Sequence, residues 1–146
     1  MPPTNRIEWT GTTTDCADET RRAGGEFVRH LSPGSVVALH GNLGTGKTTF
    51  IQGMAEGLGL GDQVSSPTFA LIHEYGQPPG LYHLDCYRET SLARWRMLGL
   101  EEYFYSSAIT AIEWAENIAP LLPDSTLHLT FSYGPQRDER IIELQP

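Results

Sequence analysis

One stretch of the chain has the residue types and the spacing of a phosphate-binding loop. Residues 41–48 read Gly-Asn-Leu-Gly-Thr-Gly-Lys-Thr and fit the pattern G-x-x-x-x-G-K-[S/T]. Glycines allow successive backbone N–H groups to point inward around a phosphate, and a helix that begins at the loop adds the positive end of its dipole. Lys47 supplies a charge for the β- and γ-phosphates, and the Thr48 hydroxyl is a ligand for Mg²⁺. The motif predicts that the chain binds a nucleotide.

The base of that nucleotide is indicated by the lysine count. Lys47 is the only lysine in the chain, so the chain cannot contain the N-K-x-D type of motif with which GTPases recognise guanine. ATP is therefore the favoured nucleotide. At average residue usage, chance produces the loop pattern in on the order of 0.5% of chains of this length.

The elements around the loop are those that a phosphate-binding loop requires. Residues 35–40 form a short apolar run bounded by glycines, which is typical of a strand buried in a parallel sheet. Apolar residues at helical spacing predict a helix over 50–58 after the loop and another over 16–31 before it. The segment 32–34, Ser-Pro-Gly, ends the earlier helix.

Strands and helices continue to alternate along the rest of the chain. The patterns predict strands at 69–75, 81–85, 108–112, 126–133 and 140–144, and helices at 91–98 and 101–105. This alternation predicts an α/β P-loop NTPase fold: a single three-layer domain over residues 1–146, with a mainly parallel central sheet and antiparallel edge strands.

Two of the predicted strands lead to a carboxylate: the strand over 81–85 ends at Asp85, and the strand over 108–112 is followed directly by Glu113. Ligands of open parallel sheets gather outside the carboxyl ends of the strands. Either side chain could hold Mg²⁺ or orient an attacking water, which are the two roles that phosphoryl transfer asks of a carboxylate. Either could instead cap the helix that follows, and the residues alone leave these roles open.

Among four further side chains, Trp114 and Arg137 have two readings each. Trp114 either fills the core or presents an aromatic ring to a base or partner. Arg137 is either a solvated residue at the tip of a hairpin or an arginine near bound phosphate. His40 and His83 lie in or beside predicted strands, and we interpret both as structural histidines.

Composition excludes several classes of protein. Among 146 residues, 18 acids and 10 bases give a net charge of −8, which disfavours direct binding to a nucleic-acid backbone. No run approaches the roughly 20 apolar residues of a membrane span, and the N-terminus lacks the pattern of a signal peptide, so we expect a cytoplasmic protein without a membrane partner. Cys16 and Cys86 have no companion cysteines, which argues against a zinc site or a disulfide framework.

Motifs outside the loop resemble those of the TsaE (YjeE) family, the P-loop ATPases of bacterial tRNA threonylcarbamoyladenosine synthesis. The resemblance covers most of the chain, from about residue 20 to residue 140. It includes the extended loop G-N-L-G-T-G-K-T-T-F at 41–50, S-P-T-F at 66–69, E-Y at 74–75, H-L-D-C-Y-R at 83–88, L-G-L-E-E-Y-F at 98–104 and I-E-W-A-E at 112–116.

The resemblance implies a partner-dependent ATPase. Such a protein binds ATP or ADP with Mg²⁺, hydrolyses ATP weakly alone, and works with two partner proteins, TsaB and TsaD. These partners transfer a threonylcarbamoyl group to the adenosine next to the anticodon, and ATP hydrolysis by the TsaE subunit resets them between rounds. The chain would then contact tRNA only indirectly, through the complex, in agreement with its acidic charge.

The resemblance also implies roles for single residues. It assigns the phosphate contacts to six residues of the loop: Leu43, Gly44, Thr45, Gly46, Lys47 and Thr48. Thr48 and Glu113 would ligate Mg²⁺, Asp85 would position or activate the attacking water, and Thr68 would sense the γ-phosphate. Trp114 and Arg137 would lie near the nucleotide.

The chain departs from the family pattern at two positions. Asn42 stands where the family usually has aspartate, which removes a charge from the loop. Ala115 stands where the family often has proline after the Glu-Trp pair, which leaves that backbone less rigid.

Two other functions remain alternatives. A small-molecule P-loop kinase needs an acceptor pocket and an arginine-bearing lid. The candidates for the lid arginines are Arg88, Arg94 and Arg96. A nucleotide-gated interaction module needs only ATP binding to change its affinity for a partner, with hydrolysis incidental.

Overall fold

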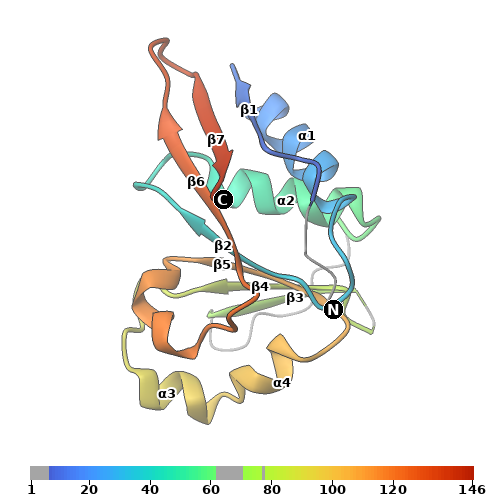
Figure 1. Ribbon diagram of the computed structural model, residues 1–146, viewed down its shortest axis with the longest axis vertical. Helices are drawn as coiled ribbons and strands as arrows, with labels where there is room; N and C mark the ends of the chain where they lie inside the picture. Colours follow the sequence, from blue (N-terminus) through green and yellow to red (C-terminus); the bar gives the residue numbers. More distant parts are fainter. Residues whose placement is uncertain (1–6, 62–70, 77) are drawn as a thin grey trace.

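The computed structural model describes residues 7–61, 71–76 and 78–146 (Figure 1). The strands are β1 (Gly11–Thr14), β2 (Val36–His40), β3 (Ile72–Tyr75), β4 (Leu81–Asp85), β5 (Ile109–Glu113), β6 (Leu127–Tyr133) and β7 (Arg140–Leu144). The helices are α1 (Ala17–Val28), α2 (Lys47–Gly57), α3 (Leu92–Met97), α4 (Leu100–Phe104) and the 3-10 helix η1 (Ala115–Leu121).

The strands form one seven-stranded sheet in the order β1-β7-β6-β2-β5-β4-β3. The four inner strands β6, β2, β5 and β4 are parallel to one another. Antiparallel strands complete both sides, with β3 paired to β4 and the β7–β1 pair added to β6. The predicted parallel sheet with antiparallel edges is confirmed.

Two separate hydrophobic cores cover the two faces of the sheet. Val37 and Leu39 of β2 pack with residues of α1 and α2, whereas Val36 and Ala38 of the same strand pack with residues of α3, α4 and η1. Figure 1 shows α1 and α2 on one side of the sheet and α3 and α4 on the other. A strand buried on both faces needs apolar residues at every position, which explains the continuous apolar run and confirms the three-layer arrangement.

Helices α1 and α2 pack backbone against backbone. A Cβ built on Gly53 would lie 1.8 Å from the Arg21 carbonyl oxygen, and one built on Gly24 would lie 2.0 Å from the Phe50 carbonyl oxygen. This close approach brings Thr20 of α1 against the phosphate-binding loop at the start of α2. Helix packing therefore helps to fix where α2 begins.

Two elements were not predicted from the sequence. Strand β1 reads Gly-Thr-Thr-Thr, without apolar alternation, and it forms through its pairing with β7. Helix η1 contains Pro120 and a non-helical residue, Ile118, so it has no regular helical period. Within the described residues, no helix is both long and apolar enough to cross a bilayer.

We predict that Gly53→Ala destabilises the fold by about 1–3 kcal/mol, because the added methyl group must push the α1 backbone away. Gly25→Ala is the matched control, since its Cβ would lie 3.3 Å from the nearest atom. We expect its tight contact to be offset by the better helix propensity of alanine, about 1 kcal/mol. Urea unfolding of both variants measures the difference. Equal stabilities would contradict the close helix crossing.

Candidate functional site

The loop between β2 and α2 surrounds a hollow beside the carboxyl ends of the parallel strands. Gly44 and Gly46 have φ values of +83° and +96°, which only glycine adopts readily. Gly46 precedes α2 and provides no side-chain cap, so the first N–H groups of the helix are left for another acceptor. The hollow has a volume of about 220 Å³ and is lined by Leu43, Gly44, Gly46, Lys47, Thr48, Thr49, Glu113 and Trp114.

Lys47 is buried in the wall of this hollow, with 4% of its surface exposed. Its Nζ donates a hydrogen bond to the Gly41 carbonyl oxygen at 2.5 Å. Burial lowers the pKa of Lys47, while the negative charges of Glu113, Glu116 and Asp85 oppose that shift. The loop thus holds a cation whose hydrogen-bond partner is a backbone carbonyl of the same loop.

The Trp114 ring packs against the Lys47 ammonium group. The Lys47 Nζ lies 4.0 Å from the centroid of the indole ring, within the range of a cation–π interaction. Among the described residues, Trp114 is the only non-glycine residue with a positive φ, 59°, and such a conformation costs roughly 1–2 kcal/mol. The ring also packs against the core beneath α3, α4 and η1, so the two readings of Trp114 are not exclusive.

Glu113 lines the same hollow as Lys47 and is also buried, with 6% exposed. The Thr48 hydroxyl lies 3.0 Å from each of its carboxylate oxygens, and the His83 Nε2 lies 2.7 Å from Oε2. Burial by itself raises the pKa of Glu113, but the hydrogen bonds and charges of His83, Thr48 and Lys47 together bring it below its usual value. The site therefore contains an ionised carboxylate bonded to the hydroxyl that the motif offers to a metal.

Asp85 stands beside Glu113, as expected for the ends of adjacent parallel strands. The register of β4 and β5 pairs the two residues. The Asp85 Oδ1 accepts a hydrogen bond from the Tyr87 backbone N–H at 3.1 Å, so it stabilises a turn rather than capping a helix. Its side chain is half-buried.

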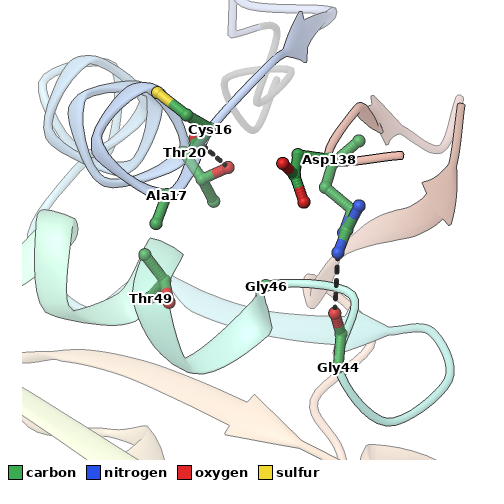
Figure 2. Close-up of a pocket in the computed structure, with 8 residues that line it drawn as sticks. Cys16, Ala17, Thr20, Gly44, Gly46, Thr49 and Asp138 are labelled. Carbon is green, nitrogen blue, oxygen red and sulfur yellow. Dashed lines mark hydrogen bonds between the residues drawn. The ribbon is translucent and has the colours of Figure 1, made fainter. Parts of the chain in front are cut away.

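A second hollow of about 400 Å³ lies on the other side of the loop. It is lined by Cys16, Ala17, Thr20, Gly44, Gly46, Thr49, Asp138 and Arg140. Figure 2 shows residues from the start of α1 and from α2 facing Asp138 of the β6–β7 hairpin across this space. The two hollows share the loop, so one elongated ligand can contact both.

The β6–β7 hairpin braces the loop from outside. The Tyr133 hydroxyl donates to the Leu43 carbonyl oxygen at 2.9 Å, and the Arg140 guanidinium lies 3.4 Å from the Gly44 carbonyl oxygen and 4.7 Å from the Tyr133 ring. Arg137 is exposed in the hairpin turn, and its carbonyl accepts a bond from Arg140. The arginine in contact with the loop is thus Arg140, for which the sequence held no motif.

The structure brings most of the predicted site residues together. Leu43, Gly44, Gly46, Lys47, Thr48, Glu113 and Trp114 line one hollow, and Asp85 adjoins Glu113 through strand register. Thr45 does not line the hollow: its side chain is buried, and its hydroxyl donates to the Asn42 carbonyl oxygen at 2.7 Å. Thr68 and the 66–68 segment lie outside the described residues, so the prediction for them stays as it was.

Comparison with known proteins gives the family. Residues 14–142 match the sequence profile described as "Threonylcarbamoyl adenosine biosynthesis protein TsaE". The chain belongs to the TsaE family. It is 42% identical over 127 residues to the tRNA threonylcarbamoyladenosine biosynthesis protein TsaE of Bacillus subtilis, covering 86% of this chain and 78% of that protein. The Treponema pallidum protein of the same name is 41% identical over 114 residues, covering 78% and 84%.

A solved structure supports the same fold. The crystal structure of YdiB from Bacillus subtilis superimposes with a TM-score of 0.74 at 36% identity, covering 92% of this chain and 82% of that one. The resemblance inferred from the motifs is therefore confirmed, and the chain is a nucleotide-binding P-loop protein of the family that serves tRNA threonylcarbamoyladenosine biosynthesis.

The environment of Glu113 makes the unfolding free energy of this TsaE-family chain depend on pH in the acidic range. The lowered pKa of Glu113 means that the unfolded chain binds a proton that the native protein does not, near the pH of about 4 at which an ordinary glutamate titrates. The resulting stability is present above that pH and is lost as the pH falls through the lowered native pKa.

We therefore predict that Glu113→Gln flattens the acid side of the curve of unfolding free energy against pH. The exposed Glu143→Gln variant is the control and should follow the wild-type curve. Denaturant unfolding between pH 3 and pH 7, the range about the glutamate pKa, measures this. Parallel curves for wild type and Glu113→Gln would contradict the described electrostatics.

Proposed function

We propose that this chain is the ATP-binding and ATP-hydrolysing subunit of the tRNA N6-threonylcarbamoyladenosine machinery and supports turnover of the TsaB–TsaD transferase. The observation that supports it best is the pair of buried opposite charges, Lys47 and Glu113, that line one hollow at an uncapped helix N-terminus. Burial of a charge is costly, and a nucleotide with its cation would give each of these two charges a partner of opposite sign.

In this proposal, the nucleotide spans the two hollows. Residues 43–48 surround its phosphates, and Lys47 exchanges the Gly41 carbonyl for phosphate oxygens. The nucleoside occupies the larger hollow beside Thr49 and Arg140, with Trp114 at the phosphate end. Arg137, at the exposed hairpin tip, keeps its predicted role near the nucleotide.

The donors present suit Mg²⁺. Thr48 and Glu113 offer a hydroxyl and a carboxylate, the oxygen ligands that a hard cation prefers. Among the described residues, no group of three or more His, Cys, Asp or Glu side chains is arranged to hold a metal ion. That agrees with Mg²⁺ at nucleotide sites, which takes one or two protein oxygens and completes its shell with phosphate and water. When bound, the ion would neutralise charge on the phosphates.

In this proposal, Asp85 positions or activates the water that attacks the γ-phosphate. The Glu113 carboxylate is enclosed by hydrogen bonds from Thr48 and His83, so it is suited to holding a cation. Asp85 is more exposed, and its bond to Tyr87 uses Oδ1, so it is suited to orienting a water beside the γ-phosphate. Thr68 contacts that phosphate in the same proposal.

The proposed partners are those that the family resemblance implies. A net charge of −8 favours contact with proteins over direct contact with tRNA, so TsaB and TsaD are the proposed partners, and tRNA is reached only through them.

The proposal predicts a slow Mg²⁺-dependent release of phosphate from ATP that rises when TsaB and TsaD are added together. Lys47→Ala is the control: we expect it to remain folded and to lose roughly 10- to 150-fold in nucleotide affinity, the effect of one charge-assisted hydrogen bond. Phosphate release and calorimetric titration measure both quantities. A rate indifferent to the pair would contradict the proposal and favour a small-molecule kinase.

We predict that Asp85→Asn keeps nucleotide affinity within a few fold and lowers hydrolysis by about 10²- to 10⁴-fold, the usual effect of losing a positioned acid–base group. The substitution retains size and the acceptor for Tyr87 but removes the negative charge. Single-turnover hydrolysis tests it, alongside a tRNA modification assay. Normal modification with hydrolysis abolished would favour the nucleotide-gated module instead.

A further inference from the structure

His83 is a buried histidine that the sequence led us to regard as structural. It lies in β4 with 6% of its surface exposed, on the same face of the sheet as Asp85, two residues further along the strand. Its Nε2 lies 2.7 Å from the Glu113 Oε2. Among the described residues, the shortest polar contact of Glu113 is therefore made with a residue outside the loop motif.

The ring of His83 is held in place from two sides. On β3, His73 is its register partner, and the two ring centroids lie 5.6 Å apart. On β5, Glu113 accepts its hydrogen bond. A side chain confined between two neighbouring strands has little freedom to rotate, so it can fix the orientation of the carboxylate to which it is bonded.

The hydrogen bonds of Glu113 give His83 a definite role. An ionised carboxylate only accepts hydrogen bonds, so the His83 Nε2 carries the hydrogen, and the Thr48 hydroxyl donates in the same way. A hydroxyl that donates its hydrogen to a carboxylate keeps its lone pairs for a metal ion. His83 thus takes one of the carboxylate's roughly four acceptor directions and leaves the others for Thr48 and for a cation.

We propose that His83 is a positioning residue, whose Nε2–H holds the Glu113 carboxylate in the orientation that faces Thr48 and the divalent cation of a bound nucleotide. The inference rests on the proposed nucleotide and Mg²⁺ site. An outer hydrogen bond of this kind aligns the group that it touches, and its loss typically weakens metal binding by 10- to 100-fold. The lowered pKa of Glu113, to which His83 contributes, agrees with that role.

Two substitutions of similar polarity separate positioning from packing. His83→Gln places an amide N–H where the Nε2–H was, whereas His83→Asn places its amide at the level of Nδ1, too short to reach Glu113. His83→Leu removes the donor altogether. The matched control is His128→Leu, because His128 is a histidine of β6 that makes a 2.8 Å hydrogen bond to His40 and lies on the opposite face of the sheet from Leu129 and Phe131.

The measurement is calorimetric affinity for ADP and for a non-hydrolysable ATP analogue, each with Mg²⁺ and with EDTA. We expect His83→Asn and His83→Leu to reduce the Mg²⁺-dependent gain in affinity by about 10- to 100-fold while the affinity in EDTA stays unchanged. His83→Gln and His128→Leu should keep the gain within a few fold. Thermal unfolding of each variant shows whether the protein is folded. If His83→Leu does not fold, the comparison of His83→Gln with His83→Asn still tests the positioning role.

The outcomes distinguish this inference from the proposed function. Equal Mg²⁺ dependence for His83→Gln and His83→Asn would overturn the positioning role and leave the nucleotide site intact. A wild-type protein whose nucleotide affinity does not respond to Mg²⁺ would overturn the proposed metal site itself, and the positioning role with it.

Discussion

Lys47 and Glu113 are two buried charges of opposite sign, and the surrounding structure is arranged to make their burial tolerable. Each is at least 94% buried, where an unpaired charge would cost several kcal/mol. The cation is met by the Gly41 carbonyl and the Trp114 ring. The anion is met by the Thr48 hydroxyl. An enclosed site with charges of both signs suits a ligand that is itself highly charged.

The positions of these charges depend on the sheet and on one helix crossing. Strand β2 pairs with β5 so that Leu39 is opposite Glu113, which brings the carboxylate to the start of the loop. Helix α2 starts at Lys47, and its contact with α1 through Gly53 fixes its axis. The hairpin of β6 and β7 then holds the outside of the loop through Tyr133. The sheet, the crossing of α1 and α2 and the β6–β7 hairpin thus contribute to one site.

The sequence predicted the parts of the site that are local. The loop, the buried strand before it and the two carboxylates after strands all follow from spacing and apolar pattern, because each depends on neighbours along the chain. The sheet's parallel core and antiparallel edges followed from the alternation of elements and are confirmed.

What could not be predicted depends on contacts between distant residues. Strand β1 has no apolar pattern of its own and exists through pairing with β7. The contact of His83 with Glu113 joins residues 30 positions apart, and that of Arg140 with Gly44 joins residues 96 apart. The positive φ of Trp114 is unfavourable for that residue type, so local propensity argues against it. Such features require the folded chain.

The central claim is that the hollow beside Lys47 receives the phosphates of a nucleotide with its cation. A crystal structure with Mg²⁺ and a non-hydrolysable ATP analogue tests it most directly. The account predicts phosphates within the loop of residues 41–48, the Lys47 Nζ moved from the Gly41 carbonyl to phosphate oxygen, and the cation at Thr48. A nucleotide bound elsewhere, or a Lys47 still bonded to Gly41 beside a bound nucleotide, would contradict it.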